Sequence, residues 1–182
     1  MTTHLVLLRG INVSGQKLIK MEDLRRLLAD AGFENVVTYI QSGNIIFESE
    51  QTDKVKVAAQ VKALIKKQYR WEVGVLALDL TDLVQTIGNN PFLKQPDPDL
   101  KHLYVAYLSE QPSADNLAKF QAFDIGRDEA VLGDRVLYLR YASGAGNTKL
   151  SNALIENKLK VVATSRNWNT TLKLRDMLSE RS

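Results

Sequence analysis

The chain has 182 residues, enough for one domain or two small ones with hydrophobic cores, and its 45% hydrophobic and 25% charged residues are ordinary for a soluble globular protein. It contains no cysteine, which excludes disulfides, thiolate metal sites, iron–sulfur clusters and a cysteine nucleophile. The net charge of +3 is too small for a strong, non-specific nucleic-acid binder. With no signal peptide and no apolar run of membrane-spanning length, we expect a cytoplasmic protein that does not associate with membranes.

The positive charge is concentrated near the C-terminus. Residues 144–182 hold 7 basic and 3 acidic side chains, whereas residues 1–143 hold 17 basic and 18 acidic ones. One interpretation is a solvated surface with random variation in charge. The other is a local field that attracts anions.

The first half of the chain predicts the element order β-α-β-β-α-β, the split βαβ or ferredoxin-like arrangement. The expected elements are a strand at 5–9, a helix at 21–31, strands at 36–40 and 44–48, a helix at 54–68 and a strand at 72–80. Gly32 is expected to end the first helix. Thr81 is expected to cap a short additional helix that Gly88 ends.

The second half predicts the same order after a connector that contains three of the four prolines, at residues 89–99. Its expected elements are a strand at 102–108, a helix opened by Ser113, a hairpin at 130–141, a helix capped by Asn147 or Thr148, a strand at 159–163 and a final helix through Leu178. The predicted fold class is α+β, with two ferredoxin-like subdomains and an additional C-terminal helix. The predicted domains are 1–90 and 101–182, joined by a connector at 91–100.

Three polar, glycine-containing clusters are candidates for a functional site. The first is RGINVSGQK at residues 9–17, which supplies Arg9, Asn12 and Lys17 on a backbone that Gly10 and Gly15 make flexible. Glycines let backbone N–H groups converge on an anion, although the Walker A and G-x-G-x-x-G patterns are absent. The alternative is an ordinary long loop between a strand and a helix.

The second cluster is QSGN at residues 41–44, between the two strands of the first predicted hairpin. Its Ser42 and Asn44 side chains are candidate ligand contacts at the edge of the sheet. The alternative is that the four residues serve only as a tight turn.

The third cluster joins SGAGNTK (143–149) and TSRNWNTT (164–171), each expected just before a helix. First turns of helices usually attract acidic residues, yet Lys149 and Arg166 are found here, which favours a bound anion. Ser165, Asn167 or Thr170 is the expected cap of the last helix. Trp168 is either a stacking surface or a core residue.

No catalytic constellation stands out. His4 and His102 are the only histidines, neither lies in a cluster with metal-ligand spacing, and no catalytic triad has support. We therefore predict no metal site and assign no cofactor and no catalytic residue.

Four segments together resemble one bacterial family in order and spacing: LLRGINVSGQ, YIQSGNIIF, the NNPF connector and TSRNWNTTLKL. The chain resembles the uncharacterised domain-of-unknown-function family 1697 (DUF). The resemblance implies an α+β fold of two ferredoxin-like subdomains and brings no reaction, substrate or cofactor. The matching positions are Arg9, Gly10, Asn12, Gly15, Ser42, Gly43, Asn44, Thr164, Arg166, Asn167, Trp168 and Thr170.

Three hypotheses for the function remain open. The first is a binding module for a phosphate-bearing ligand, a nucleotide or short nucleic acid, in a cleft between the subdomains. The second is a transferase or hydrolase without a familiar motif. The third is a structural or protein-interaction module whose polar clusters hold loops in place. For the first, the candidate ligand contacts are Arg9, Asn12, Lys17, Ser42, Asn44, Lys149, Arg166, Asn167, Trp168 and Thr170.

Overall fold

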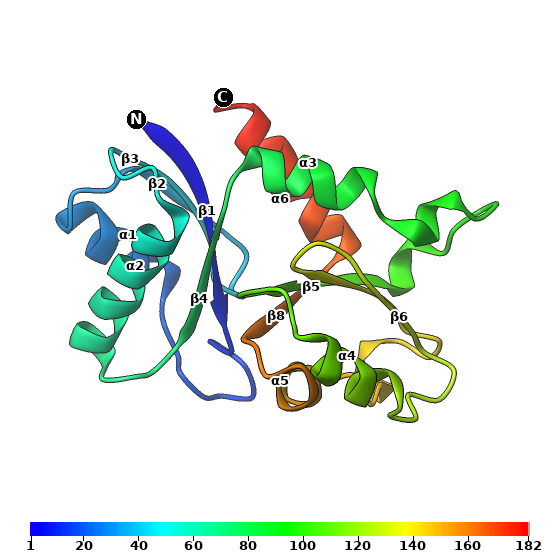
Figure 1. Cartoon of the computed structure of the whole chain (residues 1–182). Coiled ribbons are helices and arrows are strands. Elements are labelled where there is room, and N and C mark those ends of the chain that lie inside the picture. The colour runs from blue at the N-terminus through cyan, green and yellow to red at the C-terminus, as the bar shows by residue number, and fades with distance from the viewer. Residues whose placement is uncertain (182) are drawn as a thin grey trace. The chain divides into compact units, whose positions relative to one another are not determined.

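The computed structural model describes residues 1–181 and contains two antiparallel sheets of four strands each (Figure 1). The chain divides into two compact units, and each unit contains one sheet. Unit 1 comprises Met1–Leu83 together with the chain from Leu174 onward, and unit 2 comprises Val84–Lys173. The expectation of an α+β protein with two ferredoxin-like subdomains is confirmed.

Unit 1 has the expected β-α-β-β-α-β order. Its elements are β1 (Thr2–Arg9), α1 (Met21–Asp30), β2 (Glu34–Tyr39), β3 (Asn44–Ser49), α2 (Lys54–Tyr69) and β4 (Gly74–Leu78). The strands lie in the order β2-β3-β1-β4, so β1 is central and pairs antiparallel with both β3 and β4. Helices α1 and α2 lie on the same side of this sheet (Figure 1).

The apolar run at the start of the chain forms β1 because both faces of this strand are buried. Val6 and Leu8 join the core under α1 and α2, while Leu5 and Leu7 on the opposite face are also fully buried. A strand buried on two faces shows a continuous apolar run in its sequence, where a strand with one solvated face would alternate. The position of β1 fixes the loop that follows it at one end of the sheet.

Helix α1 ends at Asp30, and Gly32 terminates it as the sequence predicts. This glycine has a φ of +92°, and its N–H donates to the Ala29 carbonyl at 3.0 Å. The N–H of Phe33 donates to the Leu28 carbonyl at 3.2 Å, which completes a Schellman motif. Phe33 then packs in the core with its ring centroid 4.3 Å from that of Phe47.

Unit 2 repeats the arrangement. Its elements are β5 (Leu103–Leu108), α4 (Ala114–Gln121), β6 (Glu129–Leu132), β7 (Val136–Arg140), α5 (Asn152–Leu159) and β8 (Ala163–Asn167). The strand order is β6-β7-β5-β8, the same as in unit 1, and α4 lies beside α5 (Figure 1). The remaining elements are α3 (Leu80–Gly88), α6 (Trp168–Ser179) and the short 3-10 helices η1 (Pro91–Lys94), η2 (Leu100–His102) and η3 (Ala145–Asn147).

Three local predictions in the sequence were wrong. The strand expected at 159–163 is β8, displaced to Ala163–Asn167, because Lys160 takes a left-handed φ of 58° and ends α5. The cap of α5 is Ser151, whose hydroxyl accepts from the Leu154 N–H, so neither Asn147 nor Thr148 caps it. Helix α3 begins after Asp79 and is not capped by Thr81.

Within residues 1–181, no helix has both the length and the apolar character that a membrane crossing requires.

Candidate functional site

The side chain of Asn12 makes three hydrogen bonds that hold the loop between β1 and α1 in shape. Its Oδ1 accepts from the Ile19 N–H at 2.8 Å, and its Nδ2 donates to the carbonyls of Ile19 at 3.0 Å and Gln41 at 2.8 Å. The Asn12 N–H also donates to the Lys17 carbonyl. Asn12 therefore closes the base of its own loop and joins it to the turn between β2 and β3.

Above this base the loop forms a tight, exposed turn. The Gln16 N–H donates to the Val13 carbonyl at 3.0 Å, and the two central residues, Ser14 and Gly15, have φ of 50° and 73°. Gly10, Asn12 and Lys17 also have positive φ. Left-handed backbone at non-glycine residues costs free energy and is found where a loop is held in a special shape, often at functional sites.

Two basic side chains accompany this loop. Lys17 is half-buried, and its Nζ donates to the Glu72 carbonyl at 2.7 Å, which brings its ammonium group toward the segment before β4. Arg9, the last residue of β1, is also half-buried. The loop thus combines a fixed backbone with positive charge.

The QSGN cluster is a turn packed tightly against β1. Asn44 is fully buried, and its Nδ2 donates to the Tyr39 carbonyl at 3.0 Å and to the Ser42 hydroxyl at 2.9 Å. Gly43 has a φ of +79°, and a Cβ there would lie 2.7 Å from the Leu8 Cβ. Both its backbone conformation and the lack of space require glycine at this position.

In unit 2, Arg166 lies in the edge strand β8 and is only 7% exposed. Its Nη1 donates to the Thr164 hydroxyl and to the Ser165 carbonyl, both at 2.8 Å. Burial lowers the pKa of Arg166 to about 10, although the nearby Tyr107 opposes this shift, so the guanidinium stays charged at neutral pH. The side chain is bonded within its own strand.

The other predicted contact residues of unit 2 divide into exposed and buried positions. Asn167 is exposed and caps α6, because its Oδ1 accepts from the Thr170 N–H at 2.8 Å. It is one of the three caps that the sequence predicted for this helix. Trp168 is 2% exposed and Thr170 is 6% exposed, so the tryptophan is a core residue. Lys149 is exposed and lies 3.5 Å from the Asp124 carboxylate, three residues before α5 begins.

The ten predicted contact residues are therefore divided equally between the units. Unit 1 contains Arg9, Asn12, Lys17, Ser42 and Asn44, which the structure brings to one end of its sheet through the hydrogen bonds of Asn12 and Asn44. Unit 2 contains Lys149, Arg166, Asn167, Trp168 and Thr170. The first turns of α5 and α6 contain no acidic residue, as the sequence indicated.

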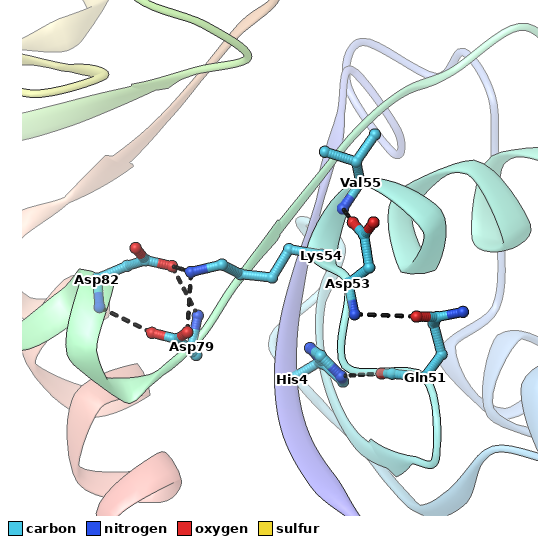
Figure 2. Close-up of polar contacts among 7 residues, drawn as sticks. All are labelled: His4, Gln51, Asp53, Lys54, Val55, Asp79 and Asp82. Atoms are coloured by element: carbon cyan, nitrogen blue, oxygen red, sulfur yellow. Dashed lines mark hydrogen bonds and ion pairs between the residues drawn. The ribbon is translucent and has the colours of Figure 1, made fainter.

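One charged cluster in unit 1 was missed from the sequence. Lys54 begins α2, and its Nζ donates to the carboxylates of Asp79 at 2.8 Å and Asp82 at 2.6 Å (Figure 2). These two aspartates also cap α3 reciprocally, because each carboxylate accepts from the other residue's N–H. The D-x-x-D spacing of Asp79 and Asp82 is a capping-box pattern. It was the sequence signal that could have placed these two aspartates at the start of α3.

The cluster shifts the pKa values of its members. Burial opposes the charge on Lys54, but hydrogen bonds to Asp79 and Asp82 and their attraction outweigh it and raise the pKa of Lys54. Burial likewise raises the pKa of Asp79, but its bonds to Lys54 and the Asp82 N–H outweigh this and lower it. The arrangement fixes the start of α3 to α2 and has no feature of a catalytic acid or base.

Metal-ligating side chains do not gather in the described part of the chain, where no group of three His, Cys, Asp or Glu residues could hold an ion. His4 is fully buried, and its Nε2 lies 2.8 Å from the Gln51 carbonyl (Figure 2). A carbonyl can only accept, so Nε2 bears the proton.

Comparison with known proteins identifies a family whose match includes the two clusters of unit 1, at residues 9–17 and 41–44. The family described as "Protein of unknown function (DUF1697)" matches residues 1–138. The chain belongs to this family. A similar solved structure is that of the conserved bacterial protein SP0830 from Streptococcus pneumoniae, with 25% sequence identity and a TM-score of 0.72, covering 97% of this chain and 98% of that one. None of the curated proteins matches the chain. Family and neighbour thus support the fold and name no ligand or reaction.

Proposed function

We propose that the chain is a binding module for a phosphate-bearing ligand, a nucleotide or a short nucleic acid, at the loop between β1 and α1. The observation that supports this most is the bonding of Asn12, which fixes a left-handed, glycine-containing backbone before any ligand arrives. A preformed loop costs less conformational entropy on binding than one that must be ordered. Its N–H groups and basic side chains are the groups that bind phosphate in proteins.

The positive charge of the first 21 residues favours the binding of an anion. Residues 1–21 contain Arg9, Lys17 and Lys20 and no Asp or Glu. Lys17 and Lys20 lie on the loop itself, and Arg9 comes immediately before it. A segment with basic and no acidic side chains at the end of a sheet raises the local concentration of anions, and the Glu72 carboxylate, which interacts with Lys17, partly opposes this effect.

The residues of the proposed site have two roles. Asn12 and Asn44 hold the backbone in place, because their side-chain bonds go to backbone groups and to Ser42. Arg9, Lys17 and Ser42 are the proposed direct contacts. The five predicted residues of unit 2 stay a prediction.

The structural hypothesis also has a specific observation in its favour. Arg166 is buried and bonded to Thr164 and Ser165 of its own strand, and Asn167 caps α6. Under this alternative, TSRNWNTT connects a strand to a helix and binds nothing. The experiment below distinguishes the two.

The test is thermal unfolding of the full chain in phosphate-free buffer with pyrophosphate, ATP, a phosphosugar and short RNA and DNA oligonucleotides. A ligand at about 100 times its dissociation constant should add about 2.7 kcal/mol to the free energy of unfolding. We expect one ligand class to raise the midpoint for wild type, and Lys17→Gln to lose most of this increase. For an oligonucleotide, losing one phosphate contact should also reduce the salt dependence of binding by about 0.7–0.9 in log–log slope.

The matched control is Lys56→Gln, which removes a positive charge from an exposed position on α2. This variant should bind like wild type, whereas a general charge effect would weaken both variants equally. If no phosphate compound raises the wild-type midpoint, the proposal is wrong. If binding survives in Lys17→Gln but is lost in Lys149→Gln, the site lies in unit 2.

A further inference from the structure

An aromatic pair in unit 1, Tyr69 and Trp71, has surface left for a further ring. The two rings are stacked, with their centroids 5.3 Å apart and their planes 18° from parallel. Both side chains pack against the core of unit 1, and both are only partly buried. Partly exposed aromatic side chains beside basic residues are the surfaces on which proteins stack nucleic-acid bases.

The backbone at Arg70 brings the two rings together. Arg70 ends α2 with a left-handed φ of 62°, and its N–H donates to the Lys66 carbonyl at 3.0 Å. The chain therefore turns between Tyr69, the last residue of the helix, and Trp71, the first residue after the turn. The aromatic pair is fixed in this way by the fold and needs no ligand to form.

Two contacts place the aromatic pair next to the loop between β1 and α1. Arg9 pairs with Gly74 in the register of β1 and β4, so the residues just before β4 lie at the end of the sheet where that loop begins. The Lys17 Nζ donates to the carbonyl of Glu72, the residue after Trp71. The loop that is proposed to bind phosphate and the aromatic pair are therefore joined through Lys17.

Three basic side chains continue from the aromatic pair along α2. Lys62, Lys66 and Arg70 are spaced four residues apart, so they lie on one face of the helix and at its end, and all three are exposed. We call these three residues the basic row. With Lys17 they provide four cations around the aromatic pair, at positions where successive phosphates of one strand can be contacted.

Two carboxylates and the end of a helix oppose this positive charge. Glu72 pairs with Lys66 and lies 3.9 Å from the Lys62 Nζ. Burial, and then the nearby carboxylate of Asp23, raise the pKa of Tyr69, which places Asp23 beside the aromatic pair. The C-terminus of α2 adds a partial negative charge. The four cations outweigh these groups, so the surface favours an anion, although only moderately.

We propose that the phosphate site takes a short single strand of nucleic acid, with one base stacked on the aromatic pair and the phosphates on the loop and the basic row. This inference rests on the proposed function and selects one class among phosphate-bearing ligands. A single strand has bases free to stack, whereas the bases of a duplex are stacked on one another. Pyrophosphate has no ring for the aromatic pair, and a mononucleotide has no further phosphates for the basic row.

The test is titration of the full chain in phosphate-free buffer with four probes: a short single strand of DNA, an abasic strand with the same number of phosphates, a duplex of the same length, and pyrophosphate. Affinities are measured by fluorescence anisotropy of the end-labelled single strand, with the other probes as competitors. We expect the single strand to bind roughly five- to 150-fold more tightly than the abasic strand, the range for the stacking of one base. The duplex should also bind more weakly than the single strand.

Tryptophan emission reports on the stacking directly. The chain has two tryptophans, and Trp168 is only 2% exposed, so a bound base can reach only Trp71. We expect the single strand to quench the emission and the abasic strand to leave it unchanged. Trp71→Phe should lose the quenching but keep most of the affinity, because an aromatic ring remains. Trp71→Leu should bind the single strand no more tightly than the abasic one.

A carboxylate variant tests the charge in the opposite direction. Glu72→Gln removes a group that opposes the phosphates and should tighten binding of the single strand roughly two- to fivefold, the range for one exposed charge pair. The matched control is Glu50→Gln, which removes an exposed carboxylate at the other end of the sheet, just after β3. This control should leave the affinity unchanged, and equal tightening by both variants would contradict a local contact.

The outcomes separate this inference from the proposed function. Equal binding of the single strand and the abasic strand, equal binding of the duplex, or wild-type affinity in Trp71→Leu would overturn the base contact and leave the phosphate site intact. Binding of pyrophosphate without binding of any strand would do the same. If none of the four probes binds, the inference and the proposed function are both wrong.

Discussion

Replacing Gly43 by alanine tests the close packing of the turn between β2 and β3. Two costs add at this position. The left-handed backbone, with a φ of +79°, costs an alanine roughly 1–2 kcal/mol. The new methyl group would also lie 2.7 Å from the Leu8 Cβ and 2.9 Å from the Ile11 Cδ1, and overpacking of this kind costs roughly 1–3 kcal/mol.

The sum is a loss of roughly 2–5 kcal/mol in the free energy of unfolding, a large part of the roughly 5–15 kcal/mol typical of a domain. Leu8 and Ile11 are fully buried core residues, so neither can move aside without disturbing the packing under α1. The free energy is measured by urea unfolding, followed by tryptophan fluorescence. For a chain of this length, we expect the melting temperature of Gly43→Ala to fall by roughly 4–20 °C.

Two other glycines separate the costs. Gly15 has a φ of +73° with nothing within 4 Å of its Cβ position, so Gly15→Ala should show the backbone cost alone. Gly133 has no positive φ, but its Cβ would lie 2.8 Å from the Tyr138 Cε2, so Gly133→Ala should show the packing cost alone. If Gly43→Ala destabilises the chain no more than Gly15→Ala does, the reasoning about packing against Leu8 and Ile11 is refuted.

Three further variants test the polar contacts. Lys54→Met should lower the free energy of unfolding by about 1–2 kcal/mol near pH 7, measured in urea, because Asp79 and Asp82 lose their shared cation. The folded-state pKa of Asp79 is lowered despite its burial, so the contribution of the Lys54 contact is present above pH 4 and is lost as the pH falls through the folded pKa. The stabilities of wild type and Lys54→Met should therefore converge in acid, and a constant difference between them would contradict the assignment. Asn12→Ala should cost about 2 kcal/mol and speed amide hydrogen exchange in residues 10–20, whereas unchanged exchange would show that other contacts hold the loop. Arg166→Ala should cost about 1–3 kcal/mol in the same urea assay because it removes charged donors from Thr164 and Ser165, and a loss below 0.5 kcal/mol would argue against a structural role.

The sequence predicted the elements whose signals are local. The apolar run of β1, the helical periodicity of α1 and α2 and the glycine that ends α1 were all readable, because backbone conformation and one-sided burial leave a periodic trace. Strand β8 was displaced in the prediction because it is an edge strand made of polar residues, Thr164 to Asn167, and its identity comes from pairing with β5. The strand was predicted at 159–163 because the residues just before β8 are apolar.

The candidate sites show the same division. The sequence by itself identified RGINVSGQK and QSGN as unusual, since glycines and amides in such density are rare outside turns and sites. Only the tertiary structure decided that Asn12 joins these two segments, because its partner Gln41 lies 29 residues away in the chain. Likewise, only the fold brings Lys17 to the carbonyl of Glu72, which lies 55 residues further along the chain. Local conformation is determined by neighbouring residues and can be read in order, whereas contacts between distant segments exist only after the sheet has aligned its strands.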